Sequence, residues 1–219
     1  MFRWGLYSLR NLWARRVTTA LTVVGLGLVV FVLLAVLMLA HGLEQTLGKT
    51  GDPENVIILR KGALSEIGSS LSREEIRAVA AQPDVRLTAD GRPLAVAEVG
   101  LQLTLRKGQG GSLTSVTLRG TAPEALAVRP AIRLIQGRLW KPGTTEIVVG
   151  ASIARQFPDA RVDRVLHFGN WAWTVVGVFE AGGSGFDSEV WGDAEQFLAT
   201  FHRSNFSSLT LRLAQPATL

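Results

Sequence analysis

The sequence contains no cysteine among its 219 residues, and its three histidines, His41, His167 and His202, are widely separated. Without cysteine no disulfide can stabilise an exported domain, so such a domain must be held together by its hydrophobic core. Thiolate metal sites are excluded as well, and isolated histidines are more typical of interfacial or surface positions than of metal ligands. The sequence therefore predicts neither a metal site nor a cofactor.

Charged residues are absent from residues 17–40, which form an apolar run of 24 residues. As a helix with a rise of about 1.5 Å per residue, this run is about 36 Å long, which is enough to cross a bilayer core of about 30 Å with some tilt. A cleaved signal peptide has a shorter apolar core and ends in a small-x-small cleavage site. Here the bulky Met38 stands at the third position before His41, where a small residue is required. We therefore predict a retained transmembrane helix over Val17–Ala40, with the lipid bilayer as its partner.

The net charge of +5 is concentrated beside this helix. Residues 1–40 carry four arginines (Arg3, Arg10, Arg15 and Arg16) and no acid, which gives +4, and the other 179 residues have 19 basic against 18 acidic side chains, which gives +1. This asymmetry argues against nucleic-acid binding and places the N-terminus in the cytoplasm by the positive-inside rule. We predict a basic cytoplasmic or interfacial tail over residues 1–16 and a helix extension and linker over 41–54.

Residues 55–219 are predicted to form an α+β domain with a mixed or antiparallel sheet and short helices, because groups of strand-like runs alternate with a few short helical ones. Ser72 and Glu75 form a capping box that begins a helix ending before Pro83, and Thr121 and Glu124 form a second box for a helix to residue 128. Two further helices are predicted over 151–157 and from Asp193 to 201. The predicted strands cover 55–60, 94–99, 101–107, 112–119, 132–135, 146–149, 165–168, 171–179 and 207–213.

Three patterns could indicate a site, and each has a plainer interpretation. Residues 42–50 nearly match a nucleotide-binding P-loop, but five residues separate the glycines and no strand precedes them. Four acids could bind calcium or support a tethered hydrolase, although a glycine-rich loop with solvated or capping acids is the preferred interpretation. Four tryptophans could stack on sugars or recruit a partner, yet core positions are more usual. The acids are Glu180, Asp187, Glu189 and Asp193, and the tryptophans are Trp140, Trp171, Trp173 and Trp191. No catalytic residue is predicted.

Within the apolar run, Thr18, Thr22 and Gly25 recur at helical spacing. Small residues on one face allow a second helix to approach closely, so these three residues are a candidate helix-packing face. Incidental placement explains the pattern equally well, because threonine and glycine are common in membrane helices.

An ordered set of short motifs resembles FtsX/MacB-type ABC transporter permeases across nearly the whole chain. The beginning, with Ser8-Leu-Arg-Asn-Leu12, Arg15-Arg16 and Thr18-Thr-Ala-Leu-Thr22, is similar to the start of their first transmembrane helix. The later motifs are similar to their MacB-like periplasmic core domain. They are Asn55–Gly62, Ser72–Glu75, Val116–Gly120, Gln136–Trp140, Ile147–Gly150, Thr174–Glu180, Phe186–Trp191 and Ser207–Leu213.

The resemblance implies a permease portion in the bacterial inner membrane, with its domain in the periplasm or outside the cell. The implied partners are an ABC ATPase subunit and a second permease chain, and the coupling would serve export or mechanotransmission. Family members have four transmembrane helices, whereas this sequence stops at Leu219. It would then be a truncated product, a fragment or half of a split permease, with an incomplete domain. The alternative function is a membrane-tethered binding module without transport, and a third hypothesis is the hydrolase using Asp187 or Glu189.

Overall fold

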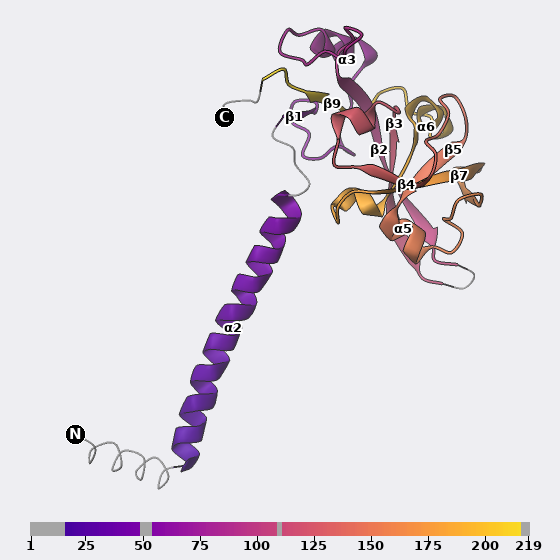
Figure 1. The fold of residues 1–219 in the computed structure, drawn as a ribbon. Helices are drawn as coiled ribbons and strands as arrows, with labels where there is room; N and C mark the ends of the chain where they lie inside the picture. The colour runs from indigo at the N-terminus through magenta and orange to yellow at the C-terminus, as the bar shows by residue number, and fades with distance from the viewer. Residues whose placement is uncertain (1–15, 49–53, 109–110, 216–219) are drawn as a thin grey trace. The chain divides into compact units, whose positions relative to one another are not determined.

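A computed structural model describes residues 16–48, 54–108 and 111–215. The chain forms two compact units, Met1–Gly48 and Lys49–Leu219, and each is described by itself. In the first unit, α2 (Arg16–Gly48) is a continuous helix of 33 residues (Figure 1). Its segment Arg16–Gly42 is long and apolar enough to cross a membrane by length and composition. The predicted transmembrane helix is therefore helical, while the tail before Arg16 lies outside the described residues.

The second unit is a mixed sheet with short helices, which confirms the predicted α+β class. The strands lie in the order β1-β9-β2-β3-β8-β5-β7-β4, and β6 pairs with β7. Parallel pairing joins β3 to β8 and β5 to β7, and the other strand pairs are antiparallel. The elements are β1 (Asn55–Ile58), α3 (Arg73–Ala80), β2 (Ala95–Arg106), β3 (Leu113–Thr121), α4 (Ala125–Val128), β4 (Arg133–Gly137), β5 (Glu146–Gly150), α5 (Ala151–Gln156), β6 (Val165–Phe168), β7 (Trp171–Glu180), the 3₁₀ helix η1 (Gly185–Ser188), β8 (Glu189–Asp193), α6 (Ala194–Thr200) and β9 (Ser208–Arg212).

Strand β2 is a single strand of 12 residues, so the prediction of two strands broken at Gly100 is wrong. The chain changes its pairing partner here instead of turning. Residues 95–98 pair with β9, and residues from Val99 onward pair with β3. Strand β2 thereby joins the small β1-β9-β2 part of the sheet to the larger part that contains β3, β8, β5 and β7.

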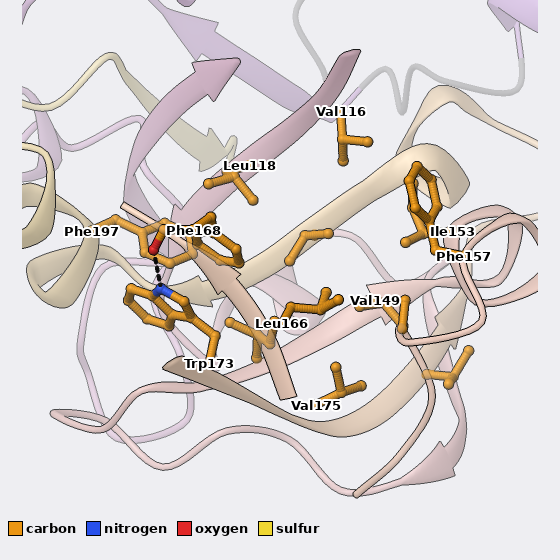
Figure 2. Packing of buried hydrophobic residues seen from close by; sticks show 14 residues of the cluster. Val116, Leu118, Val149, Ile153, Phe157, Leu166, Phe168, Trp173, Val175 and Phe197 are labelled. Carbon is orange, nitrogen blue, oxygen red and sulfur yellow. Dashed lines mark hydrogen bonds between the residues drawn. The ribbon is translucent and has the colours of Figure 1, made fainter. Parts of the chain in front are cut away.

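The two faces of the larger part carry separate hydrophobic clusters, as the alternation of side chains along a strand requires. On one face, Trp173 stacks on Phe168 at 5.1 Å between ring centroids and meets Phe197 of α6 edge to face (Figure 2). On the other face, Phe179 and Trp191 pack at 4.7 Å. Three of the four tryptophans (Trp140, Trp173 and Trp191) are therefore core residues, and Trp171 is 53% exposed.

Between the predicted strands 165–168 and 171–179, the β6–β7 hairpin turns at Gly169 and Asn170, and both residues have positive φ angles, 58° and 62°. This is the conformation that a two-residue hairpin turn requires, and glycine and asparagine adopt it readily. Trp173 and Val175 of β7 both point into the cluster shown in Figure 2, as alternate residues of a strand do. A register shift against β5 follows, so the next residue of β7 in this cluster is Val178 and not Gly177.

The first predicted capping box is present and the second is not. The Ser72 hydroxyl accepts from the Glu75 N–H, and the Glu75 carboxylate accepts from the Ser72 N–H at 2.7 Å. Thr121, by contrast, is the last residue of β3, and α4 begins after Glu124 without a side-chain cap. The Thr121 hydroxyl donates to Glu98 instead, because a buried carboxylate at this position needs a donor.

Replacing Ser72 with alanine should lower the free energy of unfolding by about 1 kcal/mol, because the first turn of α3 loses its side-chain acceptor. Urea unfolding of the chain in detergent, followed by tryptophan fluorescence, measures this change. The exposed Ser112 caps no helix, so Ser112→Ala is the matched control and should leave the unfolding curve in place. Equal effects of the two substitutions would contradict the capping assignment.

Candidate functional site

On the candidate packing face of α2, the hydroxyl of Thr22 is satisfied within the helix. The Thr22 hydroxyl donates to the Thr18 carbonyl at 2.9 Å, and a Cβ added at Gly25 would meet nothing within 4 Å. A hydroxyl bonded to the preceding turn is compatible with an apolar environment. The helix therefore presents a smooth face of small residues over Thr18, Thr22 and Gly25, and its packing role stays a prediction.

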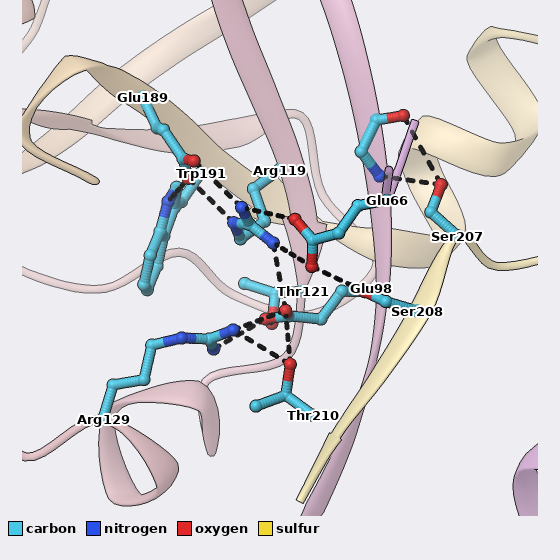
Figure 3. A network of polar contacts seen from close by, with 11 residues as sticks. Glu66, Glu98, Arg119, Thr121, Arg129, Glu189, Trp191, Ser207, Ser208 and Thr210 are labelled. Atoms are coloured by element: carbon cyan, nitrogen blue, oxygen red, sulfur yellow. Dashed lines mark hydrogen bonds and ion pairs between the residues drawn. The ribbon is translucent and has the colours of Figure 1, made fainter. Parts of the chain in front are cut away.

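A network of buried charges lies where β2 changes partner, and sequence reasoning did not find it. Its carboxylates are Glu66, Glu98 and Glu189, and its guanidinium groups are Arg119 and Arg129 (Figure 3). They come from the loop after β1, from three neighbouring strands and from the segment after α4. Strand β9 contributes Thr210 and Ser208, so the network spans both parts of the sheet.

Glu98 is the centre of this network and is fully buried. Arg129 donates to both carboxylate oxygens of Glu98, at 2.8 and 2.6 Å, and Arg119 donates at 3.1 Å. The hydroxyls of Thr121 and Thr210 complete the shell at 3.0 and 2.9 Å. Five donors therefore surround one carboxylate, which is the arrangement that makes a buried charge tolerable.

Burial by itself would raise the pKa of Glu98, but the charges of Arg119 and Arg129 outweigh it and lower the pKa to about 2. Glu98 is consequently a fixed anion and not a group that exchanges protons near neutral pH. A general acid or base needs a pKa close to the operating pH, so this carboxylate is unsuited to either role.

Arg119 uses its whole guanidinium group. It bonds bidentately to Glu189 at 2.8 and 2.9 Å and to Glu66 at 3.3 and 3.0 Å, and it also reaches Glu98. Burial would lower the pKa of Arg119, but the charges of Glu189 and Glu98 outweigh it and raise the pKa. The cation is therefore permanent, and the planar fork fixes the relative positions of the carboxylates around it.

Aromatic rings cover this network on the side of the second hydrophobic cluster. The guanidinium carbons of Arg119 and Arg129 lie 5.3 and 5.2 Å from the centroid of the Phe186 ring. Trp191 donates its indole N–H to Glu189 at 2.7 Å. The network is thus enclosed between a polar shell and rings whose faces attract cations.

The four acids predicted to be solvated or capping have different environments: Glu180 is exposed, and the other three are buried. Asp187 accepts from the N–H groups of Ala181 and Gly183, and Asp193 caps α6 through the N–H of Gln196. Asp193 thus has the predicted capping role, Asp187 holds the loop that precedes η1, and Glu189 is buried against Arg119. Asp187 lies in a 3₁₀ turn and Glu189 in β8, so they do not share a strand face.

The remaining sequence-level candidates form no site. Residues 42–48 of the P-loop-like segment are the end of α2, where the loop between strand and helix that cradles phosphate has no place. Within the described ranges, no group of three or more ligating side chains could hold a metal ion. Among the described residues, the buried network is therefore the main cluster of charged side chains. Its ion pairs stabilise the sheet domain.

Lowering the pH should weaken the fold through Glu98. Its pKa is depressed from the ordinary 4.5 to about 2 in the folded chain, so its contribution is fully present above about pH 4.5 and is lost as the pH falls through about 2. The full difference corresponds to about 3 kcal/mol. Urea unfolding at pH 7, 5 and 3 measures it, and Glu98→Gln should show a smaller decrease between pH 5 and 3. Equal pH dependence of both chains would contradict the assignment.

The described residues therefore combine an apolar helix, a mixed sheet and a buried network of ion pairs. The sequence profile of the MacB-like periplasmic core domain family matches residues 19–219, which include both the helix and the sheet. The chain belongs to this family, as the resemblance of the motifs predicted. The family and the apolar helix together indicate a membrane-anchored extracytoplasmic domain.

Solved structures share the fold at low sequence identity. The extracellular domain of the noncanonic ABC-type transporter YknZ from Gram-positive bacteria is 16% identical, covering 74% of this chain and 83% of that chain with a TM-score of 0.54. The periplasmic region of MacB from Actinobacillus actinomycetemcomitans is 15% identical, covering 78% of each chain with a TM-score of 0.56. No curated protein sequence matches this chain.

Proposed function

We propose that this chain is a permease portion of an FtsX/MacB-like ABC transporter and couples a cytoplasmic ATPase to an extracytoplasmic domain for export or mechanotransmission. The observation that carries the proposal is that one family match covers most of α2 together with the sheet domain. Only six residues, 49–54, separate the end of α2 from the start of β1. A displacement of the helix would reach the first strand through this short connection.

The fixed charges of the domain favour transmission over chemistry. Arg119 and Glu98 link strands β2, β3 and β8 through bonds of 2.8–3.1 Å, and Arg129 adds the segment after α4. Such a connected polar network resists local deformation. Chemistry would be the task of the ATPase partner, and this chain would have no catalytic role.

Purification from native membranes in mild detergent tests the proposal directly. A tagged chain should bring down an ABC ATPase and permease helices in stoichiometric amounts, as measured by mass spectrometry. The triple variant Thr18→Leu, Thr22→Leu, Gly25→Leu should reduce recovery of the partner helices, because bulky residues prevent close approach. Ala20→Leu with Gly27→Leu alters the opposite helix face and is the matched control. Recovery of neither an ATPase nor a second permease chain would overturn the proposal.

We further propose that the N-terminus is cytoplasmic and the sheet domain lies outside the inner membrane, on the basis of the four arginines before the apolar run. Because the chain has no cysteine, single cysteines report topology without background labelling. Leu64→Cys replaces a fully exposed side chain and should react with a membrane-impermeant maleimide in spheroplasts. Ser8→Cys should react only after permeabilisation, and the reverse pattern would contradict this orientation.

A further inference from the structure

Strand β2 extends beyond the strand that flanks it, and this leaves a gap in the sheet. Its pairing with β3 begins at Val99, opposite Gly120, and β3 ends at Thr121. The preceding residues 95–98 pair with β9 on their other side. Along the edge of β2 that faces β3, residues 95–97 therefore have no neighbouring strand in the part of the chain that the structure describes.

The backbone directions show which groups lie on this open edge. The carbonyl of Leu94 accepts from the N–H of Arg212 at 3.0 Å, and the carbonyl of Glu98 accepts from the N–H of Ser207 at 2.7 Å, so both point toward β9. Because successive residues of a strand point their backbone groups to opposite edges, Val96 also faces β9. The N–H and C=O groups of Ala95 and Ala97 therefore point into the gap, and both residues are only half-buried.

The gap is a groove of about 450 Å³, which lies within the size range of ligand sites. One wall is residues 95–97 of β2, and the opposite wall is formed where β3 and β8 end, at Thr121 and Asp193. Apolar side chains such as Leu94 and Phe206 line much of the remainder. Three residues of strand span about 10 Å at about 3.3 Å per residue, so the groove accommodates a short extended segment.

The charge of the groove specifies the kind of segment. Three carboxylates (Glu124, Asp193 and Glu195) and one guanidinium (Arg92) line it. Asp193 caps α6 and Glu195 pairs with Arg73 at 2.6 Å, whereas the exposed Glu124 has no ion pair among the described residues. A basic side chain at the rim therefore finds an unpaired carboxylate.

We propose that this groove binds an extended segment of a partner protein, which adds to the open edge of β2 as a strand and places a lysine or arginine beside Glu124. Main-chain hydrogen bonds to Ala95 and Ala97 supply the pairing, and Glu124 supplies the charge preference. This binding needs only the open edge of β2 and Glu124, so it does not depend on the transport role proposed above.

Residue-resolved hydrogen exchange on the full chain in detergent, with the synthetic peptide acetyl-Val-Lys-Val-Lys-Val-amide as the probe, tests this binding. In the free chain the amides of Ala95 and Ala97 should exchange rapidly, and saturating peptide should slow both at least tenfold. The amides of Val96 and Glu98 face β9 and should not change. Binding without protection of Ala95 and Ala97 would overturn strand addition, and so would protection that is already present in the free chain, which would indicate that a second copy covers the edge.

Variants separate the contribution of Glu124 from that of the backbone. Glu124→Lys should weaken the lysine peptide at least tenfold and favour acetyl-Val-Glu-Val-Glu-Val-amide, while the exposed Glu74→Lys, which changes the net charge equally, should alter neither. Ala122→Trp fills the groove and should abolish both interactions. Unchanged unfolding curves show that the variants are folded, and unchanged peptide affinities in Glu124→Lys and Ala122→Trp would overturn the proposal.

Discussion

Replacing Glu98 with glutamine should lower the free energy of unfolding of the sheet domain by about 3–5 kcal/mol, the cost of breaking a buried ion pair by removing one partner. Arg129 would lose the carboxylate that it contacts at 2.8 and 2.6 Å, and it would stay buried with the Thr210 hydroxyl and aromatic rings. Arg119 would retain Glu189 and Glu66. Urea unfolding in detergent at pH 7, followed by tryptophan fluorescence, measures the loss.

Two further variants show whether this loss comes from an unpaired charge. Glu98→Gln combined with Arg129→Met removes both partners and should recover part of the stability, because no isolated guanidinium remains buried. Glu146→Gln breaks the bidentate pair with the half-exposed Arg138 and should cost several-fold less, since water solvates the remaining cation. A Glu98→Gln chain within 1 kcal/mol of the parent would show that the network contributes little.

Replacing Gly150 with alanine should cost about 3 kcal/mol, for a steric reason. Gly150 has ordinary backbone angles (φ −66°, ψ 152°), so alanine is compatible with its conformation. A Cβ at this position would, however, lie 2.2 Å from the Asp187 carbonyl oxygen and 2.8 Å from that of Phe186. The added Cβ would clash with backbone atoms of η1, so η1 would have to move away from the N-terminus of α5. The expected cost is therefore at the upper end of the range for overpacking.

A nearby glycine supplies the control for this prediction. Gly185 begins η1, and a Cβ there would meet nothing within 4 Å. Gly185→Ala should therefore leave the urea midpoint nearly unchanged, while Gly150→Ala lowers it strongly. If both variants unfold at the same urea concentration, the close approach of η1 to Gly150 is not present in solution.

Local sequence patterns predicted most of the individual elements. The uncharged run identified the helix now seen as α2, the capping box of Ser72 and Glu75 identified the start of α3, and the strand-like run over 207–213 identified β9. Each of these signals depends on residues close together in the chain. The prediction of a break in β2 and of a capping box at Thr121 failed because distant residues determine both, namely the change of strand partner and the buried Glu98.

The charge network was missed for a related reason. Its ion pairs join residues that are 21 to 70 positions apart in the sequence, so no local motif contains a pair. A weaker signal was present, because Glu98 stands within the otherwise apolar segment 94–99, where a solvated charge is unexpected. A charge in such a strand indicates a buried ion pair, although the sequence does not show which residues are its partners.

The path of β2 also has a consequence for the order in which the domain can form. Strands β1 and β9 pair at Asn55 and Arg212, so this part of the sheet is closed by the two ends of the domain. Residues 99–207, which hold β3 through β8, lie between them in the sequence. During synthesis β1 leaves the ribosome early, immediately after the apolar helix, but its partner is made about 150 residues later. Closing so long a loop is slow. Until β9 has been synthesised, β1 remains an unpaired apolar segment that follows the membrane helix in the sequence. We therefore expect chaperones to bind the nascent chain at β1.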